Sequence, residues 1–177
     1  MIGIPLGLAY ANAAEWIIHK YVLHGLGRPK DKFWSFHFHE HHRASRKYGF
    51  VDEAYTQPGI RWDAQGKELL GIVAGTAAHL PLFPIAPFFT ATLVYSAVNY
   101  FKTHKRSHLD PAWAEKNLAW HVEHHMGRNQ DANWCVTKPF FDYVMGTRVD
   151  ARGIERKLEL GAAMARMVRG EPIWQGA

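Results

Sequence analysis

Two long apolar segments dominate the pattern of hydrophobic and polar positions. Residues 2–18 form one, of about the minimum length that spans a bilayer. Residues 69–101 form the other, which is interrupted by Pro81, Pro84 and Pro87. Because proline breaks a helix interior, this segment predicts two helices of roughly a dozen to fifteen residues that meet at LPLFPIAP as a membrane-inserted hairpin. The pattern predicts an all-α fold with membrane-embedded helices.

The basic residues support that interpretation. No Lys or Arg occurs in residues 1–19 or 68–101, and all 21 lie between and after these stretches. Such a bias is typical of positive loops on the cytoplasmic side, so we expect an integral membrane protein. The mean hydropathy of −0.26 favours shallow or partial insertion. Asn12 and Glu15 leave open that residues 2–18 are a buried helix of a soluble protein.

Length and composition set further limits. At 177 residues, we expect one domain over residues 1–177, without room for a separate reductase. A single cysteine, Cys135, excludes an internal disulfide. The net charge of +5 comes without a recognisable nucleic-acid module, so no nucleic-acid partner is expected. Residues 43–67 mix basic and aromatic side chains, which suits lipid headgroups or a solvated loop. Residues of about 150–169 predict an amphipathic helix that packs on the domain or, as an alternative, lies on the membrane.

Eleven of the twelve histidines lie in four short clusters. The clusters are residues 19–24 (HKYVLH), 37–42 (HFHEHH), 104–108 (HKRSH) and 121–125 (HVEHH). Imidazole is the commonest ligand for transition metals, and a site rich in nitrogen without thiolates suits iron or zinc. One ion needs far fewer ligands, so we expect two metal ions in one histidine cage. Each apolar segment leads into two clusters, which places the cage in a helical cap on the cytosolic side.

Helical spacing supports the third and fourth clusters directly. His104 and His108 are four residues apart, about 40° around an α-helix, and so face one site. The three histidines of the fourth cluster, His121, His124 and His125, fan over roughly 100° on one side of a helix. Both clusters therefore predict convergent ligands.

The first two clusters need more than ideal α-helical geometry. His19 and His24 are five residues apart, about 140°, and Gly25 permits a helix end from which His24 reaches back. In the second cluster, His37 and His41 share a face and His42 is turned about 100° further. His39 lies three residues before His42 and so shares a face with His42 better than with His41. It therefore stays a possible alternative ligand. The candidate ligands are His19, His24, His37, His41, His42, His104, His108, His121, His124 and His125, with His39 as a possible further ligand.

Several polar residues near the clusters are candidate acceptors for imidazole N–H groups, although each has the ordinary alternative of a solvated helix residue. These candidates are Glu15, Glu40, Glu123, Asp110 and Asn117. His79 lies outside the clusters in an apolar stretch, and its role stays open between a satisfied core residue and a pore-facing one.

The four clusters in this order, followed by NWCVTKPFFDYVMGT, resemble the fatty acid hydroxylase superfamily of membrane di-iron enzymes. The resemblance covers residues of about 15–147. It implies two iron ions, replaceable by zinc in a purified form, held by the candidate ligands above. It also implies a lipid hydroxylase that uses O₂ and takes electrons from an external cytochrome b5-like or ferredoxin-like donor. The second cluster departs from the common HxxHH form, because Phe38 stands three residues before His41.

Other functions remain open at this point. The segments EWIIHKYVLHG and HEHHR resemble carotenoid hydroxylases, whereas FDYVMGT favours the fatty-acyl and sterol branch. A lipid desaturase of the same superfamily is a further alternative. From other classes, a membrane metal carrier would bind metal without turnover, and an interfacial binding protein would use zinc structurally.

Overall fold

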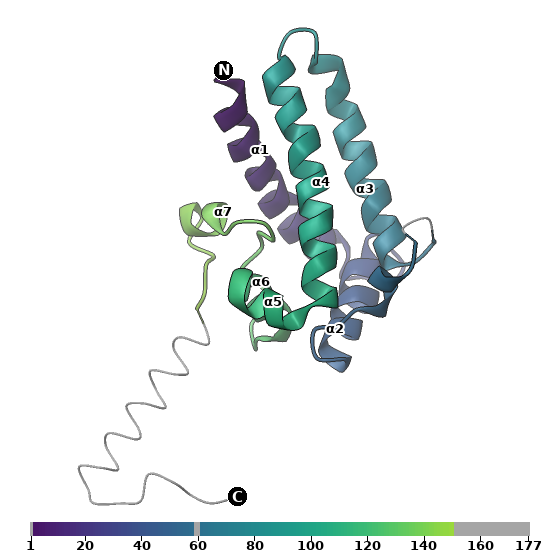
Figure 1. The fold of residues 1–177 in the computed structure, drawn as a ribbon. Coiled ribbons are helices and arrows are strands. Elements are labelled where there is room, and N and C mark those ends of the chain that lie inside the picture. Colours follow the sequence, from purple (N-terminus) through teal and green to yellow (C-terminus); the bar gives the residue numbers. More distant parts are fainter. Residues whose placement is uncertain (1, 59–60, 151–177) are drawn as a thin grey trace, which may run out of the picture.

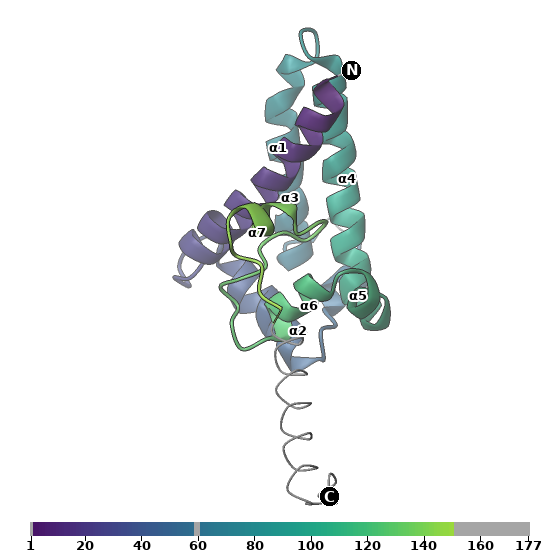
Figure 2. The same ribbon diagram turned by 90° about the vertical axis from the view of Figure 1, so that its left-hand side faces the viewer.

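The computed structural model describes residues 2–58 and 61–150, and within those ranges it contains helices and loops but no strand. The predicted all-α fold is confirmed. Three long helices, α1 (Gly3–Ile17), α3 (Ala64–His79) and α4 (Pro87–Leu109), extend toward one end, where η4 joins α3 to α4, and most of the other short elements gather at the opposite end (Figures 1 and 2). The short elements are η1 (Ile18–Leu26), η2 (His37–His42), α2 (Arg43–Lys47), η3 (Glu53–Thr56), η4 (Leu80–Leu82), α5 (Pro111–Asn117), α6 (Ala119–Met126) and α7 (Phe140–Val144).

The proline-rich stretch forms the predicted helical hairpin. Helix α3 begins after Asp63, whose carboxylate accepts a hydrogen bond from the Gly66 N–H at 3.0 Å and so caps the helix. Helix α4 begins at Pro87, where a proline costs no hydrogen bond and its fixed φ suits the first turn. The two helices therefore lie side by side and antiparallel, with their connection at the end of the molecule away from the short elements around the histidines (Figure 1).

Helix α1 packs closely against α4 because glycine faces the contact. A Cβ atom on Gly7 would lie 2.8 Å from Cβ of Thr92, and one on Gly3 would lie 2.8 Å from the backbone nitrogen of Phe89. No side chain fits at these distances. The close approach brings the end of α1, and the histidines that follow it, toward the end of α4.

The predicted membrane topology is wrong. Residues 2–18 and 69–101 are largely helical, but across residues 2–58 and 61–150 no helix combines the length and the apolarity that crossing a bilayer requires. Helix α1 has 15 residues and includes Asn12 and Glu15, and the second half of α4 carries charged and histidine side chains. The expectation of an integral membrane protein with cytoplasmic histidine clusters fails on this finding.

The segment of residues 43–67 is only in part a surface loop. Phe50 and Tyr55 are 2% and 1% exposed, whereas Trp62 is 72% exposed. Cys135 is a free, buried thiol that packs with two tryptophans. The helix predicted for residues of about 150–169 lies outside the described residues, except for residue 150.

Candidate metal centre

Two π-helical segments, η1 and η2, bring together the histidines that α-helical spacing would separate. Segment η1 continues α1 as a π-helix, in which residue i+5 bonds back to residue i, as Gly27 N–H does to the Val22 carbonyl at 3.0 Å. Residues five apart then lie on nearly the same face. His19 and His24 converge for this reason, and not because the helix ends at Gly25: the π-helix continues through Gly25 to Leu26.

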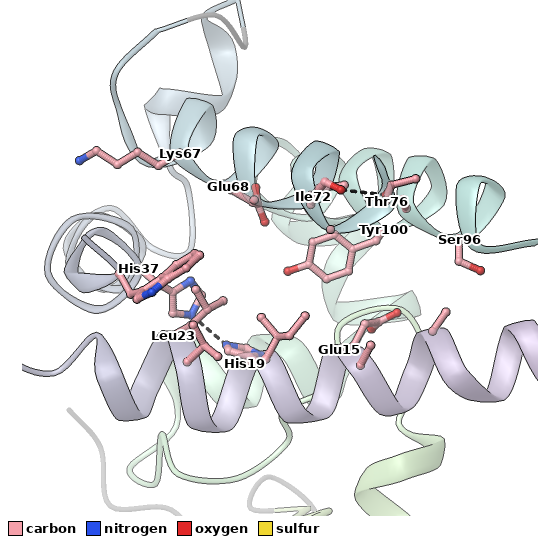
Figure 3. Close-up of a pocket in the computed structure, with 18 of the residues that line it drawn as sticks. Glu15, His19, Leu23, His37, Lys67, Glu68, Ile72, Thr76, Ser96 and Tyr100 are labelled. Carbon is pink, nitrogen blue, oxygen red and sulfur yellow. Dashed lines mark hydrogen bonds between the residues drawn. The ribbon is translucent and has the colours of Figure 1, made fainter. Parts of the chain in front are cut away.

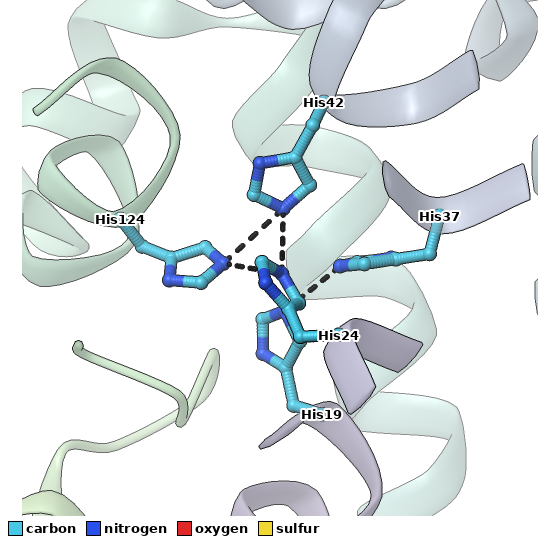
Figure 4. Close-up of side chains that lie close together, drawn as sticks. All are labelled: His19, His24, His37, His42 and His124. Carbon is cyan, nitrogen blue, oxygen red and sulfur yellow. Dashed lines mark hydrogen bonds between the residues drawn. The ribbon is translucent and has the colours of Figure 1, made fainter. Parts of the chain in front are cut away.

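The first histidine group collects side chains from three segments. One ring nitrogen from each of five buried side chains lies within 4.8 Å of the others (Figure 4). The Nε2 atoms of His19 and His37 are 2.8 Å apart, and those of His24 and His42 are 3.1 Å apart. The Nε2 atom of His124 lies 3.2 Å from that of His24 and 3.2 Å from that of His42. The first group is therefore His19, His24, His37, His42 and His124.

The second histidine group lies beside the first. His41, His104, His108 and His125 each place one ring nitrogen within 4.8 Å of the others, and all four are buried. The predicted convergence of His104 and His108 on α4 is confirmed. His121 adjoins this group, with its Nε2 atom 3.2 Å from that of His108.

Neighbouring histidines divide between the two groups. His41 and His42 are adjacent on η2 but point to different groups, as do His124 and His125 on α6. The expected pairing of His37 with His41 is replaced by a pairing with His42, because η2 is also π-helical. The rings of His42 and His125 stack with centroids 4.0 Å apart, so the two groups adjoin. All ten predicted ligands thus lie in one buried cage.

His39 lies outside that cage. Its Nε2 atom hydrogen-bonds to the Arg28 carbonyl at 2.8 Å, in a solvent-exposed contact. Of the two candidates for the start of the second cluster, the structure brings only His37 to the other histidines.

Backbone carbonyls fix two rings of the first group. The Nδ1 atom of His19 donates to the Trp134 carbonyl at 2.5 Å, and that of His124 donates to the Ala132 carbonyl at 2.7 Å. With the proton on Nδ1, each neutral ring presents the lone pair of Nε2 to the group.

Carboxylates fix two rings of the second group. The Nδ1 atom of His41 donates to Asp52 at 2.7 Å, and that of His104 donates to Glu68 at 2.5 Å. Burial alone would raise the pKa of both carboxyl groups, but their histidine partners outweigh it, so both pKa values are lowered. The carboxylates therefore stay charged and would make the two rings stronger ligands for a metal ion.

Sequence reasoning missed both carboxylates. Asp52 lies in the segment interpreted as a surface loop, and Glu68 lies 36 residues before its histidine. Tyr55 was missed too, although it donates to Glu68 at 2.7 Å. No spacing rule identifies such partners, because they meet the histidines only through the tertiary fold.

The acceptors proposed from the sequence form other contacts. Glu15 accepts hydrogen bonds from the backbone N–H groups of Val136 and Thr137 at 3.1 and 3.0 Å, and from the Thr137 hydroxyl at 2.5 Å. Burial raises its pKa to about 7. Through its hydrogen bonds Glu15 holds the loop whose Trp134 carbonyl accepts from His19, so its effect on His19 is indirect.

The other four proposed acceptors are found at or near the protein surface or in a separate ion pair. Glu40 pairs with Lys67, Asp110 accepts from the Trp113 N–H, Asn117 donates to the Trp113 carbonyl, and Glu123 pairs with Arg148.

The histidine donors fit a metal ion. In the second group, the Nε2 atoms of His41, His104 and His125 are buried without a hydrogen-bond partner. In the first group, the Nε2 atoms face one another at 2.8–3.2 Å. Two nitrogens bound at about 2.1 Å to one ion lie about 3 Å apart, so this crowding of lone pairs matches shared coordination. Each group could hold a metal ion, and imidazole donors suit iron or zinc.

Burial keeps these rings neutral, which metal binding requires. The loss of hydration, followed by repulsion from neighbouring histidines, lowers the pKa of His24 to about 2. Burial also lowers the pKa of His124 to about 4. The pKa is lowered by burial in the same way for His19, His37, His41, His42, His108, His121 and His125.

An apolar pocket of about 360 Å³ opens beside the histidines (Figure 3). Helices α1, α3 and α4 form its walls, and His19, His37 and His41 lie at one end. Figure 3 shows Glu15 and His19 on one wall, Glu68 and Thr76 on the other, and Tyr100 between them. The ligand groups thus border a space large enough for a small organic molecule.

Removing the charge of either supporting carboxylate is expected to weaken metal binding. Asp52→Asn and Glu68→Gln keep the shape of the side chain, and each should raise the dissociation constant roughly 10- to 100-fold. A competition titration with a chelator measures this change. Glu53→Gln, at an exposed neighbouring position, is the matched control and should leave the constant unchanged. Unaltered affinity in both test variants would contradict the role given to these carboxylates.

No protein-family model, curated protein or solved structure matches this chain. The likeness to the fatty acid hydroxylase superfamily therefore rests on the four histidine clusters and the segment that follows them. The contacts of the site carry any argument about function.

Proposed function

We propose that this protein is an O₂-dependent di-iron hydroxylase that acts on an unactivated C–H bond of a fatty-acyl or related lipid. One observation carries the proposal: His19, His37 and His41 belong to the histidine groups and also line the apolar pocket. A molecule in the pocket would therefore lie directly against the metal ligands. The resemblance to the fatty acid hydroxylase superfamily supports the same reaction.

The residues of the chain prepare the site in three ways. The buried rings stay neutral and so bind metal rather than protons. Asp52 and Glu68 orient His41 and His104 through hydrogen bonds. The apolar walls exclude water from the place where a C–H bond would react.

Iron supplies what these side chains lack, the redox chemistry that activates dioxygen. In the overall reaction one oxygen atom of O₂ is inserted into a C–H bond to give C–OH, and the other oxygen atom is reduced to water. This balance needs two electrons and two protons per O₂, so the proposal includes an external donor of the ferredoxin or cytochrome b5 class.

Oxygen consumption tests the proposal. Iron-loaded protein, supplied with reduced ferredoxin, should consume O₂ only when a lipid is present, and mass spectrometry should find one added oxygen in the product. Zinc-loaded protein is the control, because zinc has no redox chemistry and should be inactive. Loss of two hydrogens instead of gain of oxygen would identify a desaturase. Tight iron binding without lipid-dependent O₂ uptake would overturn the enzyme in favour of a metal carrier.

A further inference from the structure

The apolar pocket has a second polar feature, at the end away from the histidine groups. Tyr10 on α1 and His79 on α3 both line the pocket, and the Tyr10 hydroxyl lies 2.9 Å from Nε2 of His79. The Nδ1 atom of His79 donates to the Gly75 carbonyl at 2.7 Å. In the neutral ring Nε2 is therefore an acceptor, and the tyrosine hydroxyl donates to it.

This pair is accessible from outside. Tyr10 is 45% exposed and His79 is partly exposed, so the pair lies at the rim of the pocket rather than in its floor. The Tyr10 hydroxyl donates to His79 and keeps lone pairs that can accept a hydrogen bond. Nε2 of His79 can accept from another donor in place of Tyr10. The rim thus offers both a donor and an acceptor to a polar group that enters the pocket last.

The charges along the pocket restrict what that polar group can be. Among the described lining residues the only Lys or Arg is Lys67, which lies at the histidine end and is paired with Glu40 at 2.7 Å. The residues around Tyr10 and His79 at the rim include Ala11, Gly75 and Thr76. No Lys or Arg lies there among the described lining residues to neutralise a carboxylate or a phosphate, and so an uncharged hydrogen-bonding group fits best.

The helices give the distance between the two ends. Tyr10 precedes His19 by nine residues, which is about 13 Å of helix. On the opposite wall, Glu68, which holds His104, precedes His79 by eleven residues, or about 16 Å. An extended alkyl chain advances about 1.25 Å per C–C bond, given a bond length of about 1.5 Å. The interval corresponds to roughly ten to thirteen bonds.

We infer that the Tyr10–His79 pair binds the uncharged polar end of a long-chain amphiphile, such as an alcohol, and so places a carbon about ten to thirteen bonds away against the histidine groups. This inference rests on the proposed function for the fate of that carbon. The binding itself needs neither metal nor oxygen.

Binding to metal-free protein tests the inference independently of catalysis. The probes are 1-dodecanol, 1-chlorododecane and dodecanoate, each measured by displacement of a fluorescent apolar dye. The alcohol should bind about 3- to 10-fold more tightly than the chloride, because one hydrogen bond contributes a free energy of that size. It should also bind more tightly than the carboxylate. Tyr10→Phe and His79→Phe should abolish the preference for the alcohol. Tyr95→Phe, exposed on α4 and away from the pocket, is the matched control and should retain it.

The outcomes separate this inference from the proposed function. Equal affinity for alcohol and chloride, tighter binding of dodecanoate, or an unchanged preference in both rim variants would overturn the inference even if the protein oxidises lipids. A Tyr10-dependent preference for the alcohol would support it even if no O₂ is consumed. If the protein is active, wild-type product should carry oxygen about ten to thirteen bonds from the hydroxyl group, and Tyr10→Phe should spread that position.

Discussion

Metal-free protein is expected to unfold when it is acidified from about pH 7.5 to about pH 5.5. Nine buried histidines have a pKa below the value of about 6.5 that they regain in the unfolded chain. Below pH 6.5 the unfolded chain binds protons that the folded chain does not, so stability present above this pH is lost as the pH falls. A histidine whose folded-state pKa lies well below this interval removes up to about 1.4 kcal/mol over it, and several such histidines together rival a typical total stability of about 5–15 kcal/mol.

Denaturant titrations at several pH values measure this loss. Metal-loaded protein is the comparison, and it should tolerate a lower pH because a bound ion holds the rings in their neutral form. Metal should be retained through this interval and released only at a lower pH, because burial lowers the pKa of the folded rings and they compete weakly for protons. An unfolding midpoint that does not change between pH 7.5 and 5.5 in the metal-free protein would contradict the burial of neutral rings.

Replacing His37 with alanine is expected to empty the first histidine group, whereas replacing His39 should not. His37 lies in the group with its Nε2 atom 2.8 Å from that of His19, and His39 bonds only to a surface carbonyl. The loss of a ligand should exceed the roughly 100-fold loss in affinity that follows removal of a supporting partner. Metal content after dialysis, measured by elemental analysis, distinguishes the two variants.

The two variants make a matched pair, because both remove an imidazole from η2. His37→Gln keeps more of the buried volume and guards against simple unfolding, which circular dichroism would detect. Equal metal loss in His37→Ala and His39→Ala, or loss in His39→Ala alone, would refute the assignment of the first group.

Much of the fold was predictable because it depends on local signals. The prolines between residues 80 and 88 cannot lie in the interior of an α-helix, and so they fixed the hairpin of α3 and α4. The span across a membrane was not a local signal of this kind. In α1 the small residues Gly3 and Gly7 pack on α4, and Ala11 and Ala14 line the pocket, whereas large apolar side chains such as Leu6 are exposed.

Which histidines gather was predictable, but not their arrangement. Ten histidines in four clusters indicated a shared site, and all ten are gathered in one cage. The sequence does not show where an α-helix widens into a π-helix, so the pairing of His37 with His42 could not be foreseen. Asp52 and Glu68 were equally hidden, because a carboxylate that meets its histidine through tertiary contacts leaves no periodic pattern.

The loop after α6 controls when the site can be completed. Its carbonyls at Ala132 and Trp134 orient His124 and His19, and the Asp142 carboxylate fixes it by accepting from the Trp134 N–H at 2.8 Å. A nascent chain on the ribosome therefore cannot hold His19 and His124 in these orientations until synthesis has passed residue 142. We expect loading with metal to follow translation, and ribosome-bound chains that stop at α6 should retain no ion in the first group.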